Sequence, residues 1–348
     1  MTDQEWGLLQ QVVRGDAVEP LPVGFIIDSP WLPGWYGVKI LDYISDNEVW
    51  LNANLQAVRD FPEVMFLPGF WSEFGMCTEP SAFGSRCTFP PDEFPHAHPI
   101  PGATEAIDSL AVPDPRKDGM LPFVLNRLKL AHPKIEAAGH RIRFAVSRGP
   151  LNIASYLMGM TEFLTLLMTD PERAETLLQK ITAFVKGWLL LQRETFPSID
   201  GILLLDDIIG FMGEREFRRF GLPHFVELFS ADVSIRFLHN DAPCRMVAPF
   251  LPEMRVNLFN MGFEISLNEL KQLTQSKVTL LGNIPPRDVL ANGSADDITK
   301  ATVDLVTSLT DRSRIVLSCG GGMPPGVSSG NILAFVNAVR GCPVRTSQ

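Results

Sequence analysis

Short apolar runs alternate with longer segments of helical periodicity along this chain. Eight runs have the length and the Val, Ile, Leu and Phe content of buried strands, and each is followed by a helical segment, some with an added insertion. The runs are residues 21–27, 63–67, 141–146, 201–205, 233–238, 255–259, 278–281 and 314–318. Strands that alternate with helices in this way are typical of a parallel sheet.

Eight such units predict the α/β class and a single (β/α)8 TIM-type barrel, with residues 1–348 as one domain. An amphipathic N-terminal helix over residues 3–15 precedes the first strand, with Trp6, Leu9 and Val13 near one face. A doubly wound open sheet is the alternative. It is disfavoured because no Gly-x-Gly-x-x-Gly pattern opens a helix after the first strand.

The helical segments that follow the strands have the usual period of apolar positions. They are expected over residues 47–60, 119–138, 152–158, 161–168, 171–196, 214–230, 244–252, 266–275, 294–310 and 329–340. Residues 68–120 form a long insertion after the second strand, which is typical of a functional or a disordered loop. Its many aromatic residues speak against disorder. His96 and His98 alternate there as metal ligands do, although ordinary surface histidines are the favoured interpretation.

Composition and charge narrow the function classes. The net charge of -10 argues against nucleic acid as a partner, because phosphate binding requires a basic face. No apolar run approaches the roughly 18 residues of a membrane span, and the polar first residues do not resemble a signal peptide. Five cysteines at unrelated spacings predict reduced thiols and a cytoplasmic protein without membrane partners.

Polar residues follow most of the predicted strands. In a barrel of this kind, chemistry collects at the carboxyl ends of the strands. The residues at or just after those ends are Asp28, Ser147, Arg148, Asp206, Asp207, His239, Asp241, Asn260, Asn283 and Cys319. The chain therefore predicts a site at this rim.

The most informative stretch is Ser234-Ile-Arg-Phe-Leu-His-Asn-Asp241, because His239 and Asp241 are two apart and face the same side of an extended segment. With Cys319 they would supply nitrogen, carboxylate and thiolate ligands, which suit zinc and leave a fourth position open. The alternative is structural. His239 would then be a hydrogen-bonded strand end, Asp241 a helix cap and Cys319 a small buried hydrophobe.

Two further candidates for catalysis are ambiguous. The carboxylates of Asp206 and Asp207 could act as general base, metal ligand or partner of a cationic substrate, or one could cap the helix near Glu214. Arg148 precedes Gly149-Pro150. It could bind a substrate carboxylate in bidentate fashion, or form a structural ion pair with Asp206 or Asp207.

Three segments together resemble the uroporphyrinogen decarboxylase superfamily. They are Gly149-Pro-Leu-Asn-Ile-Ala-Ser-Tyr-Leu-Met-Gly159, Leu281-Gly-Asn-Ile-Pro-Pro-Arg-Asp-Val-Leu290, and Ser318-Cys-Gly-Gly-Gly-Met-Pro-Pro325 with the helix to Arg340. Each motif is weak alone, and the set is fairly specific. The resemblance implies a distorted (β/α)8 barrel, in agreement with the strand count.

The superfamily contains decarboxylases of porphyrin synthesis and corrinoid-linked methyltransferases. The decarboxylases carry an Arg-Gln-Ala-Gly-Arg segment after the first strand, where this chain has Ile27-Asp-Ser-Pro-Trp31. Their catalytic aspartate has no counterpart in Phe66-Leu-Pro-Gly-Phe70. The methyltransferases resembling those of methanol and methylamine metabolism bind zinc through His-x-Cys at the fifth strand and Cys at the eighth. His239 and Cys319 match that pattern, while Asp241 stands in place of the first Cys.

The resemblance implies a zinc-dependent, corrinoid-linked methyltransferase of the O-demethylase type. It would move a methyl group between a small substrate, for example a methoxylated aromatic compound, and the cobalt of a corrinoid (cobalamin) carried by a partner protein. A homodimer is among the expected assemblies. A metal-free decarboxylase or lyase using Asp206 or Asp207 as acid and base is the alternative.

The apolar loop over residues 29–37 is interpreted either as a pocket wall or as a loop packed on the core. The expected substrate-binding residues are Asp28, Trp31, Trp35, Trp71, Tyr156 and Asn283.

Overall fold

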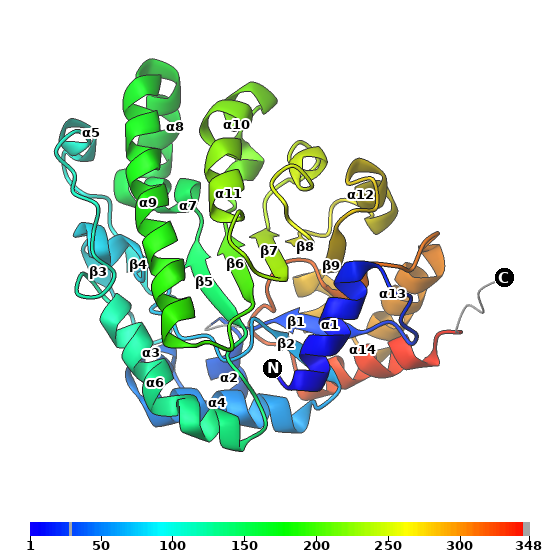
Figure 1. The fold of residues 1–348 in the computed structure, drawn as a ribbon. Helices are drawn as coiled ribbons and strands as arrows, with labels where there is room; N and C mark the ends of the chain where they lie inside the picture. Colours follow the sequence, from blue (N-terminus) through cyan, green and yellow to red (C-terminus); the bar gives the residue numbers. More distant parts are fainter. Residues whose placement is uncertain (28–29, 344–348) are drawn as a thin grey trace.

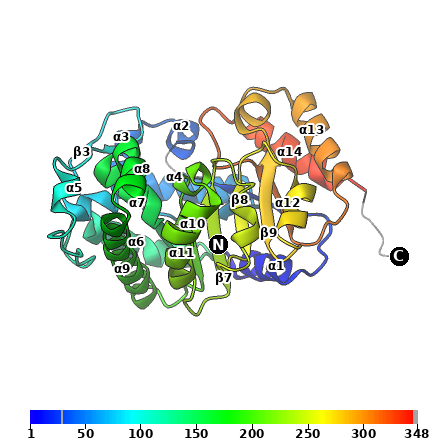
Figure 2. The same cartoon turned by 90° about the horizontal axis from the view of Figure 1, so that it is seen from above.

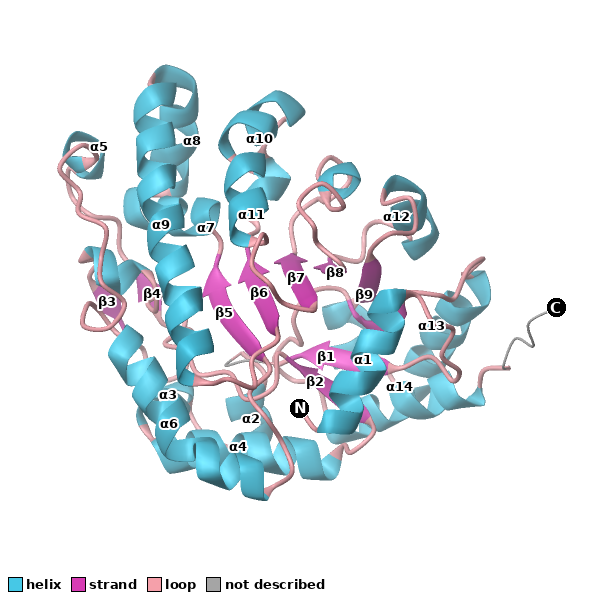
Figure 3. Ribbon diagram, viewed as in Figure 1, coloured by secondary structure: helices cyan, strands magenta, loops and turns pink. Residues whose placement is uncertain are grey.

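A computed structural model describes residues 1–27 and 30–343. Eight parallel strands form one sheet, and helices surround it (Figures 1 and 3). The strands are β1 (Val23–Ile26), β2 (Val64–Leu67), β5 (Phe144–Arg148), β6 (Gly201–Leu205), β7 (Ile235–Asn240), β8 (Leu258–Met261), β9 (Thr279–Ile284) and β10 (Ile315–Cys319). The predicted (β/α)8-type barrel is confirmed. Almost every strand residue is buried, as expected for parallel strands that are covered on both faces.

The barrel is open along one seam. The hydrogen-bonded order is β2-β1-β10-β9-β8-β7-β6-β5, so within the described residues no ladder joins β2 to β5. The predicted insertion begins at this seam. It contains the 3-10 turn η1 (Pro80–Phe83), a small antiparallel pair of β3 (Cys87–Thr88) and β4 (His96–Ala97), and α5 (Ala103–Ala106). The insertion is therefore ordered, as its aromatic content predicted.

The remaining elements follow the predicted alternation. They are α1 (Asp3–Arg14), α2 (Leu32–Tyr36), α3 (Ile40–Ser45), α4 (Asn47–Asp60), α6 (Leu121–Ala137), α7 (Pro150–Met158), α8 (Met160–Thr169), α9 (Pro171–Thr195), η2 (Ile208–Phe211), α10 (Glu214–Phe220), α11 (Leu222–Leu228), η3 (Ala248–Phe250), α12 (Leu267–Leu273), η4 (Pro286–Ala291), α13 (Ala295–Ser308) and α14 (Ser329–Gly341). Seen from above, α6 and α9 lie on one side of the molecule and α13 and α14 on the other (Figure 2).

Several predicted elements differ from the structure, among them the strand expected over residues 255–259, which is β8 (Leu258–Met261) and contains Asn260 instead of preceding it. The helix expected over residues 214–230 breaks at Gly221 into α10 and α11, with Pro223 in the first turn of the second. The helix expected over residues 244–252 is only the short turn η3, because Pro249 and Pro252 lack the amide N–H that a longer helix needs. Strand β5 lies later than predicted, so Arg148 is its last residue instead of following it.

Helix α1 covers the amino-terminal end of the barrel. It begins at a capping box of Thr2 and Glu5 and ends at Gly15, whose positive φ of 95° closes the last turn. Its buried face packs on inward-facing strand residues, with Trp6 edge-on to Phe144 at 5.3 Å. The interior of the barrel is thus a packed core at this end.

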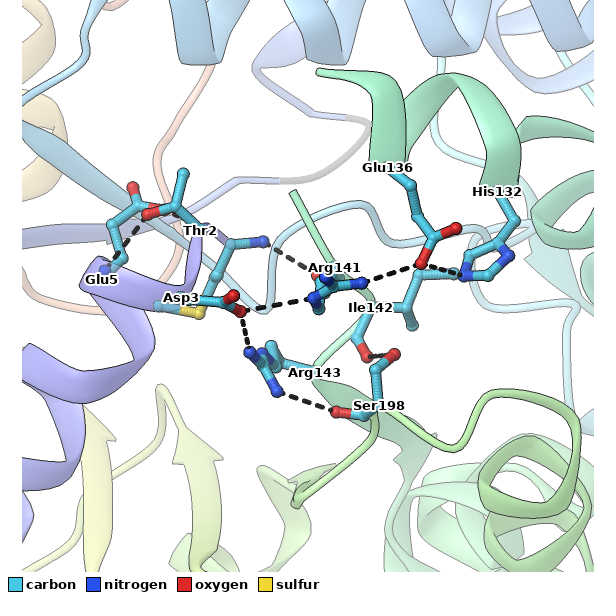
Figure 4. A network of polar contacts seen from close by, with 10 residues as sticks. Thr2, Asp3, Glu5, His132, Glu136, Arg141, Ile142, Arg143 and Ser198 are labelled. Atoms are coloured by element: carbon cyan, nitrogen blue, oxygen red, sulfur yellow. Dashed lines mark hydrogen bonds and ion pairs between the residues drawn. The ribbon is translucent and has the colours of Figure 1, made fainter. Parts of the chain in front are cut away.

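A polar network fastens the N-terminus to the segment before β5 (Figure 4). The terminal ammonium group donates to the carbonyl oxygen of Arg141 at 3.0 Å. The Asp3 carboxylate pairs with Arg141 at 3.4 Å and with Arg143, and Glu136 pairs with Arg141 at 2.8 Å. The contacts of Met1 and Asp3 with Arg141 and Arg143 join segments about 140 residues apart, so they hold α1 across the barrel end.

In the described part of the chain, no single helix has the length and hydropathy of a membrane span. Only α7 and α8 together meet the length and composition of a span, and they are bent by 107° at their junction.

Candidate active site

A cavity of about 470 Å³ lies at the carboxyl ends of the strands, where the sequence predicted the site. Its walls are the segments that follow β7, β8, β9 and β10, together with a few residues from β1 and β6. The lining residues are Ile26, Pro30, Leu205, His239, Asp241, Ala242, Pro243, Cys244, Arg245, Gly262, Phe263, Glu264, Ile265, Pro286, Arg287, Gly320, Gly322, Met323, Pro324 and Pro325. Apolar walls with few charged groups are typical of small-molecule sites.

His239 is held in one orientation by Asn260 on the neighbouring strand, its register partner. The side-chain amide of Asn260 donates to the carbonyl oxygen of Leu281 at 2.7 Å, which leaves its Oδ1 as an acceptor. His239 Nδ1, at 2.8 Å from that oxygen, therefore carries a proton. Nε2 is then the ring nitrogen that faces Asp241, whose Oδ1 is 3.7 Å away.

Asp241 lies at the mouth of the cavity, directly against the loop that follows β10. Its carboxylate occupies the space that a side chain at Gly321 would need, and Gly321 has a positive φ of 74°. Although 53% of the side chain is exposed, removal of the carboxylate from water raises the pKa of Asp241. Asp207 raises this pKa further, and His239 lowers it. Because Gly321 has no side chain, the Asp241 carboxylate can lie directly against the loop that follows β10.

Cys319 is the last residue of β10 and is fully buried. Its Sγ lies 3.8 Å from the carbonyl oxygen of Gly321 and 3.9 Å from that of Gly322. Burial and the nearby charge of Asp241 raise the pKa of the Cys319 thiol to about 12. The thiol is therefore protonated at neutral pH unless a cation arrives beside it.

The fit to zinc can be tested on these three side chains. The donor types suit the ion, and a histidine whose other ring nitrogen is hydrogen-bonded is the usual arrangement of an imidazole ligand. The positions of the three side chains suit zinc less well than their donor types do. In residues 1–27 and 30–343, no three His, Cys, Asp or Glu side chains lie close enough together to hold a metal ion. The predicted ligands His239, Asp241 and Cys319 thus share one corner of the rim, but their side chains do not converge on a single point.

Asp206 has a structural place that the sequence did not predict. It is fully buried, and its Oδ2 accepts hydrogen bonds from the backbone N–H groups of Leu151 and Asn152 at 2.9 and 3.2 Å, at the start of α7. Burial raises the pKa of Asp206 well above its ordinary value, and Asp207 adds to this effect. Asp206 caps α7, not the helix near Glu214, and it does not line the cavity.

Asp207 is half-buried and supports the cavity wall. Its Oδ1 accepts a hydrogen bond from the backbone N–H of Asp241 at 2.7 Å. Its own N–H donates to the side-chain oxygen of Asn152 at 3.1 Å. Asp207 therefore positions Asp241, and like Asp206 it is absent from the cavity lining.

Arg148 pairs with carboxylates, but not with Asp206 or Asp207. Its guanidinium group contacts Glu73 at 2.9 Å and Glu79 at 3.3 Å, and all three side chains are at least nine-tenths buried. Glu79 also accepts from the backbone N–H of Arg148 at 3.0 Å. The expected binding of a substrate carboxylate by Arg148 is disfavoured, because the insertion already supplies two carboxylates.

Those of the expected substrate-binding residues that the structure describes lie outside the cavity lining. Trp31 is fully buried, donates from Nε1 to the carbonyl oxygen of Val327 at 2.9 Å and stacks on Trp35 at 5.1 Å, so the loop packs on the core. Asn283 donates to the carbonyl oxygens of Gly262 and Ile265 and thereby shapes the wall from behind.

Two more of the expected substrate-binding residues can be placed. Trp71 and Tyr156 are half-buried on the side of Arg148. Asp28 lies outside the described residues.

The cavity lining includes residues that were not predicted from the sequence. Arg287 stands in the first turn of the π-helix η4, directly after β9, and is exposed. In the described part of the chain, none of the ion pairs includes it. Arg245, on the same cavity, pairs with Glu269. The Gly282-Asn283 motif could have pointed to Arg287, since it places the residue just beyond a strand end.

Asp206→Asn is expected to flatten the pH dependence of stability. Because the folded pKa of Asp206 is raised, the folded chain takes up its proton at a higher pH than the unfolded chain. The free energy of unfolding therefore rises as pH falls from neutral towards about 3.9, the ordinary pKa of aspartate. Asparagine removes this contribution. Denaturant unfolding at several pH values measures the effect, with the less buried helix cap Asp170→Asn as control. Equal slopes for Asp206→Asn and wild type would contradict the prediction.

Known proteins resemble this chain over most of its length. The family model for uroporphyrinogen decarboxylase matches residues 8–342. A uroporphyrinogen decarboxylase of Coxiella burnetii (strain Dugway 5J108-111) is 23% identical over 315 residues, which covers 86% of this chain and 83% of that protein. A methylated-thiol–coenzyme M methyltransferase of Methanosarcina mazei is 22% identical over 256 residues, which covers 73% of this chain and 62% of that protein.

Solved structures show the same fold. A methyltransferase from Methanosarcina mazei superposes with a TM-score of 0.78 at 20% identity, covering 95% of this chain and 96% of that one. A B12-independent methionine synthase from Shewanella sp. W3-18-1 gives a TM-score of 0.56 at 10% identity, covering 92% and 98%.

Proposed function

The chain belongs to the uroporphyrinogen decarboxylase family of enzymes, and we propose that it is a methyltransferase that moves a methyl group between a small substrate and the cobalt of a corrinoid protein. The observation that carries this proposal is the orientation of His239. Asn260 directs its Nε2 towards Asp241 at the cavity, and Cys319 ends a strand at the same rim. A histidine so oriented is prepared to bind a metal ion.

His239, Asp241 and Cys319 would hold a zinc ion in this proposal, and their side chains would have to move towards one another to do so, because they do not converge on one point among the described residues. Zinc bound there would polarise the oxygen atom that carries the methyl group. The chain contributes orientation: Asn260 fixes the imidazole, and Asp207 fixes the backbone of Asp241. The raised pKa of the Cys319 thiol favours its protonated form. Binding of a cation to Cys319 would therefore be coupled to loss of the thiol proton.

The walls of the cavity favour a compact, partly apolar substrate. Phe263 is exposed and Met323 is buried on the lining, with Ile265 and several prolines beside them. Arg245 and Arg287 are the arginines on the cavity, and Arg245 already pairs with Glu269. Among the described residues, the cavity therefore offers too few cations for a porphyrinogen with many carboxylates. A small methoxylated aromatic compound with one anionic group fits better.

Metal content and methyl transfer test the proposal together. The purified protein is expected to contain zinc by elemental mass spectrometry, and to convert cob(I)alamin to methylcobalamin in the presence of a methoxybenzoate, followed by absorbance. The metal measurement does not depend on the choice of methyl donor. Protein without zinc, and unable to bind added zinc, would overturn the proposal.

Carboxy-lyase activity is the second candidate function, because several relatives of the chain are uroporphyrinogen decarboxylases. Release of carbon dioxide from uroporphyrinogen by the metal-free protein would favour it. The buried, helix-capping position of Asp206 speaks against the expected use of that carboxylate as acid and base.

Arg287→Ala is expected to weaken substrate binding. A hydrogen bond to a charged group contributes roughly 1.5–3 kcal/mol, so we expect KM for an anionic donor to rise about 10- to 100-fold. KM for an uncharged methoxybenzene should change little, because that compound has no group for the guanidinium to bind. Steady-state kinetics with both donors make the comparison, and Arg215→Ala, on the exposed face of α10, is the control. A similar rise for both donors would contradict this role.

A further inference from the structure

Two cysteines of the insertion lie side by side, away from the cavity. The backbone N–H of Met76, next to Cys77, donates to the carbonyl oxygen of Pro95 at 3.0 Å, and Cys87 pairs with Ala97 two residues further along that segment. The two cysteines therefore lie against the same short segment, and each thiol shifts the pKa of the other. They are not joined by a disulfide.

Both backbones are fixed by other contacts, so the pair does not depend on one flexible loop. The N–H of Cys77 donates to the carbonyl oxygen of Phe74 at 3.1 Å, and its own carbonyl oxygen accepts from Ser81 at 3.0 Å. Cys87 belongs to β3 and pairs with Ala97 of β4. The fold thus presents the two sulfurs to each other as part of its ordered structure.

The environments of the two cysteines differ in a way that assigns them different roles. Cys77 is fully buried, whereas Cys87 is partly exposed. Interaction with Cys77 lowers the pKa of the Cys87 thiol, whereas interaction with Cys87, together with burial, raises the pKa of the Cys77 thiol. A reachable thiol of lowered pKa beside a second, sheltered thiol is typical of a redox-active pair.

We propose that Cys87 and Cys77 form a reversible redox site, in which Cys87 reacts first with a low-molecular-weight disulfide and Cys77 completes an internal disulfide. The Cys87 thiolate attacks one sulfur of the small disulfide, breaks its S–S bond and releases one thiolate. Cys77 then loses its proton to solvent and attacks Cys87. The mixed disulfide breaks and the second small thiolate leaves. Two electrons pass from the cysteine pair to the small disulfide, which becomes two thiols.

The disulfide would close residues 78–86 into a loop. That segment carries Glu79, one of the two carboxylates on Arg148, and the turn η1. Oxidation would therefore tie the insertion together beside the seam between β2 and β5. The proposal does not depend on the methyltransferase function, since neither cysteine lies on the cavity.

Disulfide mapping tests the proposal on the folded, full-length protein. The protein is incubated with oxidised glutathione, blocked with N-ethylmaleimide in acid, and digested with trypsin, which cleaves after Arg86 between the two cysteines. The expected result is one linked pair of peptides, one containing Cys77 and the other Cys87, with loss of both alkylated forms. Treatment with a thiol reductant should restore them.

Variants assign the order of reaction. Cys77→Ser should retain glutathione on Cys87, because the second step is blocked, and Cys87→Ser should leave Cys77 unmodified. Cys342→Ser, which removes another partly exposed cysteine, should leave the linkage unchanged. Circular dichroism confirms folding of each variant. Wild-type protein in which Cys77 and Cys87 remain separately alkylated, or in which either links to a different cysteine, would overturn the proposal.

Discussion

Replacing His239 with alanine is expected to lower the rate of methyl transfer by more than about 100-fold. Loss of an outer partner of a metal-binding histidine typically costs 10- to 100-fold in affinity or activity, and loss of the histidine itself should cost more. His239 is also the ring that Asn260 orients, so its removal leaves Asn260 Oδ1 without this donor. Zinc content and cobalamin methylation are measured on the same preparation.

His132→Ala is the control for this prediction, because His132 is a histidine of α6 outside the cavity lining that contacts Glu136 at 3.6 Å and the ring of Phe196. It should keep wild-type zinc content and rate. Full zinc occupancy and full activity in His239→Ala would contradict the assignment of the metal to this corner of the cavity.

Replacing Arg148 with methionine is expected to lower the free energy of unfolding by roughly 3–5 kcal/mol, the usual cost of breaking a buried ion pair on one side. The change leaves the carboxylates of Glu73 and Glu79 buried without their cation. Denaturant unfolding measures the effect. Adding Glu73→Gln and Glu79→Gln to Arg148→Met should recover part of the loss, because the buried negative charges are then removed.

Arg141→Met provides the matched control. Arg141 also contacts two carboxylates, those of Asp3 and Glu136, but its side chain is 43% exposed. Exposed ion pairs contribute about 1 kcal/mol or less, so this variant should be close to wild type in stability. If both substitutions lowered the free energy of unfolding equally, the buried cluster of Arg148, Glu73 and Glu79 would contribute no more to stability than the exposed ion pairs of Arg141.

The strand count and the position of the site were predictable from the sequence for a simple reason. Strands of a parallel sheet are buried on both faces, so each appears as an uninterrupted apolar run, and the residue after the run lies at the functional rim. His239 and Asp241 were identified on that basis, and both line the cavity. The period of the apolar residues also predicted α1, α4 and α9 closely.

Other features depend on contacts between distant parts of the chain. Arg148 meets Glu73 and Glu79 across 69 or more positions in the sequence, so spacing suggested the nearer Asp206 and Asp207 instead. The insertion that delivers those glutamates has no periodic pattern. Trp31 was expected at a pocket wall because proline and glycine surround it, yet burial of a large indole against Trp35 and Phe66 decided its position. The open seam between β2 and β5 leaves no mark on the apolar runs.

The packing of α1 across the amino-terminal end of the barrel bears on kinetics. With that end filled by Trp6 and its neighbours, the cavity lined by His239 lies at the opposite, carboxyl end of the strands. A small molecule and a macromolecular partner would both approach the cavity from that end. In the proposed reaction the small molecule must then arrive before the partner docks, and it cannot leave until the partner departs. A compulsory order of binding thus follows from a helix that never touches a reactant.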